Sequence, residues 1–64
     1  MKIYVEQQNK QLNKKFKGTA KRLLNELGVS VEAVLIIRNG ELVMEDEILT
    51  NEDEIKLLSV VSGG

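Results

Sequence analysis

The chain has 64 residues, the size of one small domain, and its hydrophobic content of 42% and charged content of 30% are ordinary for a globular protein. It contains no cysteine and no histidine, which excludes disulfides, thiolate metal sites and the most common general base and metal ligand. We therefore expect a protein that is not an enzyme, that has no catalytic residue of its own, and that binds neither a cofactor nor a metal ion.

The net charge is −1, but the charged residues are unevenly distributed. Residues 1–22 contain seven lysines and arginines and one acid, whereas residues 23–64 contain nine acids and only Arg38 and Lys56 as bases. Such asymmetry would steer a charged partner, unless these side chains serve only to solvate exposed elements. No apolar run approaches the roughly 18 residues of a membrane-spanning helix, and the N-terminus lacks the apolar core of a signal peptide. These features, with the absence of cysteine, favour a cytoplasmic protein without membrane contact.

The first part of the chain predicts two strands. Ile3 and Val5 alternate with outward-facing neighbours, which is the period of a strand with one buried face. Residues 7–10 are polar and are expected to turn. A second strand over residues 11–17 then places three side chains on one side: Leu12, Lys14 and Phe16.

A short amphipathic helix is expected next. Thr19 is a suitable N-cap, and Gly28 stands where a residue in the left-handed conformation would end the helix. Between these two residues the apolar positions recur at helical spacing and form one stripe: Ala20, Leu23, Leu24 and Leu27. Because so short a helix is marginal in isolation, we expect its stripe to pack on a sheet.

The middle of the chain predicts a hairpin. An unbroken apolar run over residues 33–38 ends at Asn39-Gly40, and a return strand follows over residues 41–43. Asn-Gly is the strongest short-range hairpin signal, because both residues tolerate a positive φ. The acid-rich residues 44–53 are then expected to cross the surface as a loop anchored by Ile48 and Leu49.

Residues 54–60 are predicted to form the last strand, and apolar side chains at nearly every position favour a central place in the sheet. The order strand, strand, helix, strand, strand, strand predicts an α+β fold, with one helix covering one face of a mixed sheet of four to five strands. No proline, internal repeat or linker divides the chain. We expect a single domain over residues 1–64, with residues 61–64 as a flexible C-terminal tail.

The sequence ends with Gly63-Gly64, preceded by Val61 and Ser62. Glycine lacks a Cβ, so this stretch is slim and can adopt dihedral angles closed to other residues. We interpret it as an arm that presents a terminal carboxylate to the active site of another protein. The alternative is a frayed end without a role, since chain termini are commonly disordered.

These elements together resemble the β-grasp fold of ubiquitin and, more closely, the small sulfur carriers ThiS and MoaD. The Ser-Gly-Gly ending is more like MoaD, whereas the short length and the Asn-Gly hairpin are more like ThiS. One departure is the turn over residues 51–54, where ThiS proteins usually have Asp-Gly-Asp; Asn51 can itself adopt the left-handed conformation. The resemblance covers essentially the whole chain and rests on five stretches: Ile3–Val5, Leu23–Gly28, Ile37–Val43, Asp53–Leu58 and Val61–Gly64.

The resemblance implies a role for the C-terminal glycine. In this family an E1-like adenylating enzyme of the ThiF or MoeB type consumes ATP and attaches AMP to the terminal glycine, and a sulfur donor then converts the acyl-adenylate to a thiocarboxylate. Gly64 would be the site of attachment, and Gly63, Ser62 and Val61 the tail that reaches the partner's active site. The sulfur would pass to a synthase or thiolase in thiamin, molybdopterin or thiolated-tRNA biosynthesis.

A carrier also needs a surface on which its partners dock. If the helix covers one face of the sheet, strand alternation places large apolar residues on the opposite face, which usually marks an interaction surface. Alternatively, Leu35 and Ile37 pack beneath residues 44–53. We call the uncovered side the outer face and expect five of its residues to bind partners: Tyr4, Leu35, Ile37, Leu58 and Val60.

Other roles stay open at this point. A ubiquitin-like modifier would be joined through Gly64 to lysines of target proteins, and a non-covalent β-grasp interaction domain would have an incidental tail. The acidic residues 45–47 and 52–54 lack the spacing and central glycine of a calcium loop. Phe16 is the only aromatic residue within the basic stretch of residues 10–22, and the net charge is negative, so direct nucleic-acid binding is not expected either. We expect a monomer when no partner is present.

Overall fold

The structure is a computed structural model, and it describes residues 1–60. The strands, the helix and two 3₁₀ turns (η) follow one another in this order: β1 (Lys2–Val5), η1 (Glu6–Gln8), β2 (Lys10–Asn13), β3 (Gly18–Thr19), α1 (Ala20–Leu27), η2 (Val31–Ala33), β4 (Val34–Arg38), β5 (Glu41–Val43), β6 (Ile48–Leu49) and β7 (Glu54–Ser59).

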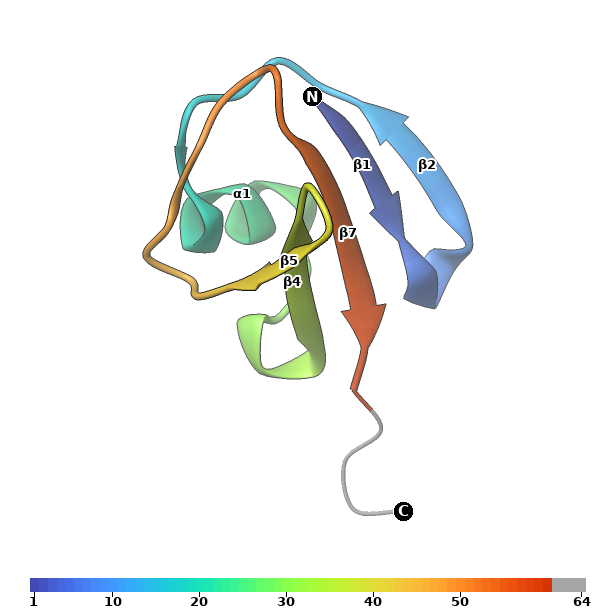
Figure 1. Cartoon of the computed structure of the whole chain (residues 1–64). Coiled ribbons are helices and arrows are strands. Elements are labelled where there is room, and N and C mark those ends of the chain that lie inside the picture. Colours follow the sequence, from blue (N-terminus) through green and yellow to red (C-terminus); the bar gives the residue numbers. More distant parts are fainter. Residues whose placement is uncertain (61–64) are drawn as a thin grey trace.

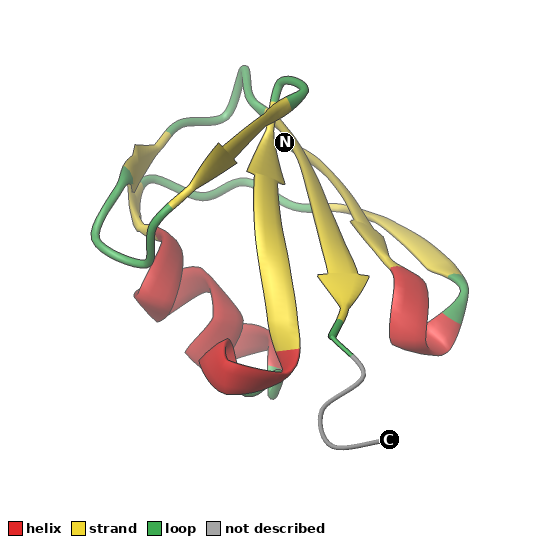
Figure 2. Ribbon diagram, turned by 60° about the horizontal axis from the view of Figure 1, so that its bottom comes forward, coloured by secondary structure: helices red, strands yellow, loops and turns green. Residues whose placement is uncertain are grey.

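Five of the strands form one mixed sheet in the order β2-β1-β7-β4-β5, so the last strand of the chain lies at its centre. β7 is parallel to β1 and antiparallel to β4, and the pairs β1–β2 and β4–β5 are antiparallel. The helix α1 lies against one face of this sheet (Figures 1 and 2). The expected α+β architecture of a β-grasp fold is confirmed, and so is the central place that the apolar sequence of β7 predicted.

The core lies between α1 and the covered face of the sheet. The parallel register of β1 and β7 places Ile3 beside Ile55 and Val5 beside Leu57, so the two ends of the chain build the centre of the core together. Six apolar side chains of β1, β4 and β7 on the covered face are buried: Ile3, Val5, Val34, Ile36, Ile55 and Leu57.

The helix has the boundaries that its capping residues predict. Thr19 Oγ1 accepts a hydrogen bond from the N–H of Arg22 at 3.3 Å, which is the expected N-cap. Gly28 has a φ of 72° and donates to carbonyl oxygens in the last turn of α1, which is the expected left-handed C-cap. Between the caps, the apolar stripe packs into the core, where Ala20, Leu23 and Leu24 have no exposed surface.

The hairpin between β4 and β5 also forms as predicted. Asn39 and Gly40 have φ angles of 50° and 85°, and two successive positive values define the type I′ turn that favours Asn-Gly. This two-residue turn fixes the register of the strands, with Arg38 opposite Glu41 and therefore Ile37 opposite Leu42.

The second strand differs from the prediction. β2 ends at Asn13, which pairs with the first residue of β1, instead of at residue 17, and one more main-chain bond follows, from the Lys14 N–H to the Met1 carbonyl at 3.0 Å. The polar turn before β2 is the 3₁₀ turn η1, which ends at Asn9 with a φ of 46°. Beyond β2, the chain turns inward and buries Phe16, whose N–H donates to the side-chain oxygen of Asn51.

Residues 44–53 form more structure than the predicted loop. Ile48 and Leu49 form β6, which pairs with β3 in a separate two-stranded sheet. Leu49 is fully buried and anchors the segment, but Ile48 is 55% exposed, so the expectation that both are anchors is wrong for Ile48. Two-residue strands are too short to show an alternation of apolar and polar residues, which explains why the sequence did not predict them.

The turn after β6 is closed without a left-handed asparagine. Asn9 and Asn39 are the two non-glycine residues with positive φ within residues 1–60, so Asn51 does not use the left-handed conformation that an asparagine can adopt. Instead, an Asp53 carboxylate oxygen accepts from the N–H of Thr50 at 2.8 Å, and the Asp53 N–H donates to the Thr50 carbonyl at 3.1 Å. With no positive φ at residues 51 and 52, this turn does not require a glycine.

Candidate functional site

The predicted tail and attachment site, Val61, Ser62, Gly63 and Gly64, lie outside the described residues. The structure does describe the place from which they continue. Figure 1 shows β7 ending at the edge of the molecule, between η1 and the turn η2 that precedes β4. β7 itself ends at Ser59, one residue before the predicted end.

The last described residues are held by hydrogen bonds on both sides. The N–H of Val60 donates to the carbonyl oxygen of Ala33 at 2.9 Å, on the side of β4. The N–H of Ser59 donates to Oε1 of Glu6 at 2.9 Å, on the side of β1. The main chain is therefore fixed up to the point where the predicted tail begins.

The five residues predicted to bind partners come together on or beside the outer face. Strand pairing places Leu35 of β4 directly opposite Leu58 of β7. Two residues further along these strands, Ile37 of β4 lies opposite Lys56 of β7. Lys56 also pairs with Tyr4 of β1. Tyr4 Oη donates to Asn9 Oδ1 at 3.2 Å, which fixes the orientation of its ring.

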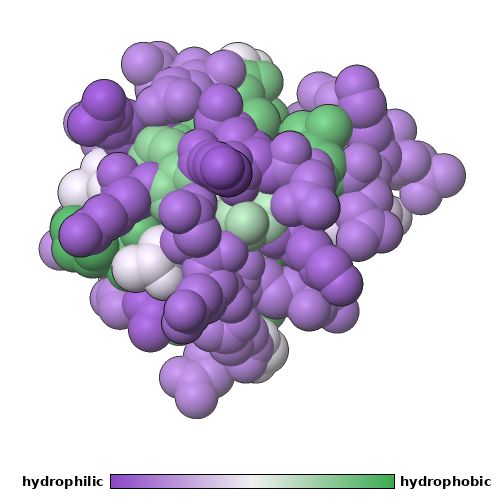
Figure 3. Space-filling model, turned by 90° about the horizontal axis from the view of Figure 1, so that it is seen from above, coloured by the Kyte–Doolittle hydropathy of each residue, from purple (hydrophilic) through white to green (hydrophobic). Residues whose placement is uncertain are grey.

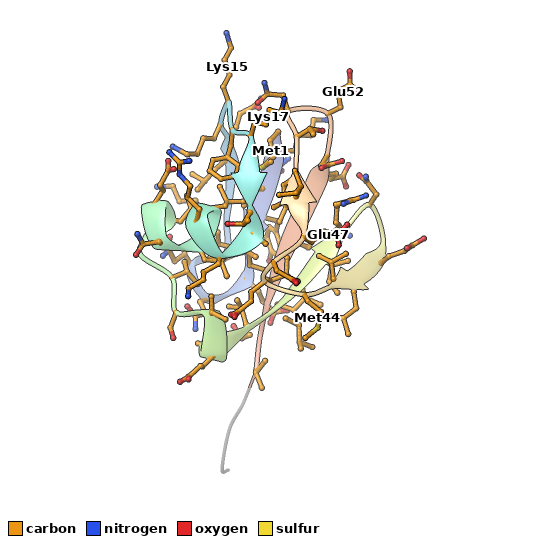
Figure 4. All side chains as sticks on the ribbon, turned by 90° about the vertical axis from the view of Figure 1, so that its left-hand side faces the viewer. Met1, Lys15, Lys17, Met44, Glu47 and Glu52 are labelled. Atoms are coloured by element: carbon orange, nitrogen blue, oxygen red, sulfur yellow. The ribbon has the colours of Figure 1, made fainter. Side chains whose placement is uncertain are left out.

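Residues 44–53 do not cover Leu35. This segment is bound on the helix side of the sheet, where Glu47 and Glu45 carbonyl oxygens accept the N–H groups of Ala20 and Lys21 at 2.9 and 2.8 Å. Figure 4 shows Glu47 close to α1 in the same part of the molecule. Leu35 is 45% exposed and Val60 is 40% exposed, while Tyr4, Ile37 and Leu58 are half-buried.

Sequence reasoning missed two residues of the outer face. Leu42 of β5 lies opposite Ile37 and is 62% exposed, and it extends the apolar surface toward the edge of the sheet. The two-residue turn after Arg38 already implied this pairing, so counting back from Asn39-Gly40 would have found it. Lys56 was missed because the sequence prediction assigned only apolar and aromatic residues to this face, although strand alternation places Lys56 on the same side as Leu58.

Lys56 gives the outer face a positive charge among apolar side chains. It is exposed, and it forms no ion pair within residues 1–60. An open hollow on this face is lined by residues of β1 and β7, among them Tyr4, Lys56 and Leu58. A partner that covers this hollow would have to supply a carboxylate for Lys56, because burial of an unpaired ammonium group is costly.

Other charged residues form structural contacts away from the outer face. Arg38 contacts Oε2 of Glu47 at 2.7 Å and Oδ1 of Asp53 at 3.9 Å. The bond from the Thr50 N–H lowers the pKa of Asp53 below its usual value despite partial desolvation, with smaller contributions from Asn39 and Arg38. Within residues 1–60 no three acidic side chains converge as a metal site would require.

The end of the molecule opposite β7's exit is polar. Seen from this end, the surface is mainly hydrophilic, and apolar side chains show only between polar ones (Figure 3). Some of the basic residues of the N-terminal third are paired, as in the contacts of Lys14 and Arg22 with Glu26 at 3.3 and 3.6 Å. The described part of the chain has no helix whose length and apolarity would suit a membrane crossing.

Comparison with known proteins agrees with this geometry. A sequence model of the ThiS family matches residues 3–64, which include nearly all of the sheet, the helix and the outer face. The chain is also similar to the sulfur carrier protein TtuB of Thermus thermophilus, with 32% identity over 57 residues, or 89% of this chain and 88% of that protein. With a β-grasp fold and a match from Ile3 to Gly64, the chain belongs to the ThiS family of sulfur carrier proteins.

Proposed function

We propose that this protein carries sulfur as a thiocarboxylate on Gly64. The family match, which extends to Gly64, is the observation that carries this proposal. The central strand β7 supports it, since β7 leads directly from the core to this segment. The protein acts as a substrate of other enzymes and performs no catalysis itself.

The chemistry follows from the poor reactivity of a carboxylate. The Gly64 carboxylate oxygen attacks the α-phosphorus of ATP in an adenylating enzyme of the ThiF or MoeB type, and pyrophosphate leaves. A sulfur donor then delivers sulfur at the oxidation level of sulfide, which attacks the carbonyl carbon and displaces AMP. Because Gly63 and Gly64 have no side chains, they leave the carbonyl open to attack in a narrow channel.

The outer face is the proposed docking surface for the adenylating enzyme. Burial of a large apolar side chain contributes about 1.5–3 kcal/mol before the costs of association, so a few such residues support a transient complex. Transient binding suits a carrier, which must leave the adenylating enzyme and then reach a sulfur-accepting synthase or thiolase. Thiamin, molybdopterin and thiolated-tRNA biosynthesis are the proposed destinations of the sulfur, in the cytoplasm.

Intact-protein mass spectrometry of protein purified from its native cell tests the proposal directly. We expect a fraction whose mass corresponds to the exchange of one oxygen for sulfur, located by fragmentation at Gly64. Isopeptide adducts with lysines of other proteins would instead indicate a ubiquitin-like modifier. An unchanged mass in growing and in sulfur-starved cells would contradict both reactions.

A second experiment tests the role of Gly64 in vitro. With an adenylating enzyme of the ThiF or MoeB type, we expect deletion of Gly64 or Gly64→Ala to abolish pyrophosphate exchange, because the reacting carboxylate is displaced or crowded. Circular dichroism controls for folding. Normal adenylation of the chain without Gly64 would contradict the proposed attachment site.

A further inference from the structure

The inference concerns the hydrogen bond donated by Ser59, the last residue of β7. The N–H groups of successive strand residues point alternately to the two neighbouring strands. The N–H of Val60 points toward the β4 side, where it donates to Ala33, so the N–H of Ser59 points toward β1. On this side the strand partner is missing, because β1 ends at Val5, which pairs with Leu57, and the chain turns away into η1.

The side chain of Glu6 replaces the missing strand partner. Its Oε1 accepts the Ser59 N–H at 2.9 Å, an ordinary N–H···O distance, and the bond is stronger than a neutral one because the acceptor is a carboxylate. The main chain of Glu6 is itself fixed, because its carbonyl oxygen accepts the N–H of Asn9 at 3.0 Å. Within residues 1–60 the Glu6 carboxylate forms no ion pair, and its hydrogen bond is with Ser59.

We propose that Glu6 is a positioning residue for the proposed reaction at Gly64. The carboxylate extends the sheet by one side-chain bond and, together with Ala33 on the other side, fixes the main chain at Ser59 and Val60. The main chain at the last described residues is thereby fixed before a partner binds. This inference rests on the proposed function, because fixing this point matters only if the residues beyond it must reach an active site.

The expected effect is on the reaction rate and not on docking. Without the bond from Glu6, the chain beyond β7 starts from a wider range of directions, and fewer complexes place the carboxylate against ATP. Glu6→Ala should therefore lower kcat for adenylation by about three- to tenfold, the range expected for loss of one orienting hydrogen bond. KM should stay unchanged, because the residues of the outer face remain in place. Glu6→Gln retains an oxygen acceptor and should recover kcat to within about twofold of the wild type.

Two measurements on the same variants test this. Steady-state pyrophosphate exchange with a ThiF- or MoeB-type adenylating enzyme and ATP gives kcat and KM. Amide hydrogen exchange followed by NMR reports the Ser59 N–H in the free carrier, and we expect its protection to fall by about tenfold in Glu6→Ala but not in Glu6→Gln. The matched control is Glu52→Ala, which removes an exposed carboxylate at the end of the molecule opposite β7's exit (Figure 4).

The outcomes separate this inference from the proposed function. A lower kcat with unchanged KM in Glu6→Ala, rescue by Glu6→Gln and no change in Glu52→Ala would support a positioning role. If the wild type and Glu6→Ala react equally fast, or if Glu6→Gln is as slow as Glu6→Ala, the positioning role is wrong while the proposed function stands. If the wild type is not adenylated, or if the chain without Gly64 is adenylated normally, the proposed function fails and the positioning role fails with it.

Discussion

Two adjacent leucines in β7 serve different purposes because successive side chains of a strand point to opposite faces. Leu57 faces α1 and has no exposed surface, whereas Leu58 is half-buried and lies opposite Leu35 on the outer face. Leucine therefore stabilises the fold at position 57 and, in our proposal, binds partners at position 58.

Alanine substitutions at these two positions should lower the free energy of unfolding by different amounts. Leu57→Ala removes a buried side chain and should lower the free energy of unfolding by about 2–5 kcal/mol. Leu58→Ala should lower it by much less, because part of the side chain is already in water. Urea denaturation of both variants measures the difference, and equal losses would contradict the assignment of Leu58 to the outer face.

Charge on the outer face should impair docking without unfolding the protein. Leu58→Asp and Ile37→Asp each place a carboxylate in the proposed interface, and we expect KM for adenylation to rise by about tenfold or more, since an unpaired buried charge is costly. Urea denaturation controls for folding. Unchanged kinetics in both variants would show that partners dock elsewhere.

Asp53 should make stability depend on pH in a defined window. Its folded-state pKa lies below the unfolded value of about 3.9, so the carboxylate stabilises the fold above about pH 4, and this contribution is lost as the pH falls through the lowered folded-state pKa. Asp53→Asn should cost about 1 kcal/mol at pH 7, toward the low end for a charged acceptor because solvent screens the group.

Denaturation of the wild type and Asp53→Asn at several pH values tests this expectation. The difference between the two proteins should shrink below about pH 4, where Asp53 of the unfolded wild type becomes protonated before Asp53 of the folded protein does. The comparison removes the contributions of the other acids, which are the same in both chains. A difference that stays constant from pH 7 to pH 3 would mean that the charge of Asp53 does not stabilise the fold.

At the scale of elements, α1 depends on Thr19 at its start. Thr19 Oγ1 satisfies the N–H of Arg22, and carbonyl oxygens of residues 44–53 satisfy those of Ala20 and Lys21. Thr19→Ala should therefore lower the free energy of unfolding by about 1 kcal/mol, while Thr19→Ser should preserve most of the stability. Equal stability of the alanine and serine variants would indicate that residues 44–53 hold the helix terminus by themselves.

At the scale of the whole molecule, β1 and β7 join the two ends of the chain in the centre of one sheet. The core therefore cannot form from either half alone. A chain that lacks residues 54–64 should show no cooperative unfolding transition, because it loses Ile55 and Leu57. Deletion of Gly64 alone, which removes no side chain, should leave the free energy of unfolding within about 0.5 kcal/mol of the wild type. Cooperative unfolding of the shorter chain would contradict this account of the core.

The sequence by itself determined the elements whose signals are local. The caps Thr19 and Gly28 bound the helix because their hydrogen bonds lie within a few residues, and Asn39-Gly40 defines the hairpin because its turn type depends on two residues. The apolar residues at nearly every position of β7 indicated a central strand, which is its place in the sheet. Period-two alternation then assigned Tyr4, Leu35, Ile37 and Leu58 to one face.

Only the tertiary structure decided the features that depend on contacts distant in sequence. The end of β2 at Asn13 is set by the length of its partner β1, and the pairing of β3 with β6 joins segments about 30 residues apart, too short to show a pattern. The exposure of Leu35 depended on whether residues 44–53 pack on the helix side or on the outer face. The hydrogen bond from Ser59 to Glu6 joins residues 53 positions apart in the sequence. It forms because β1 ends before β7 does, and no short stretch of sequence indicates this difference in strand length.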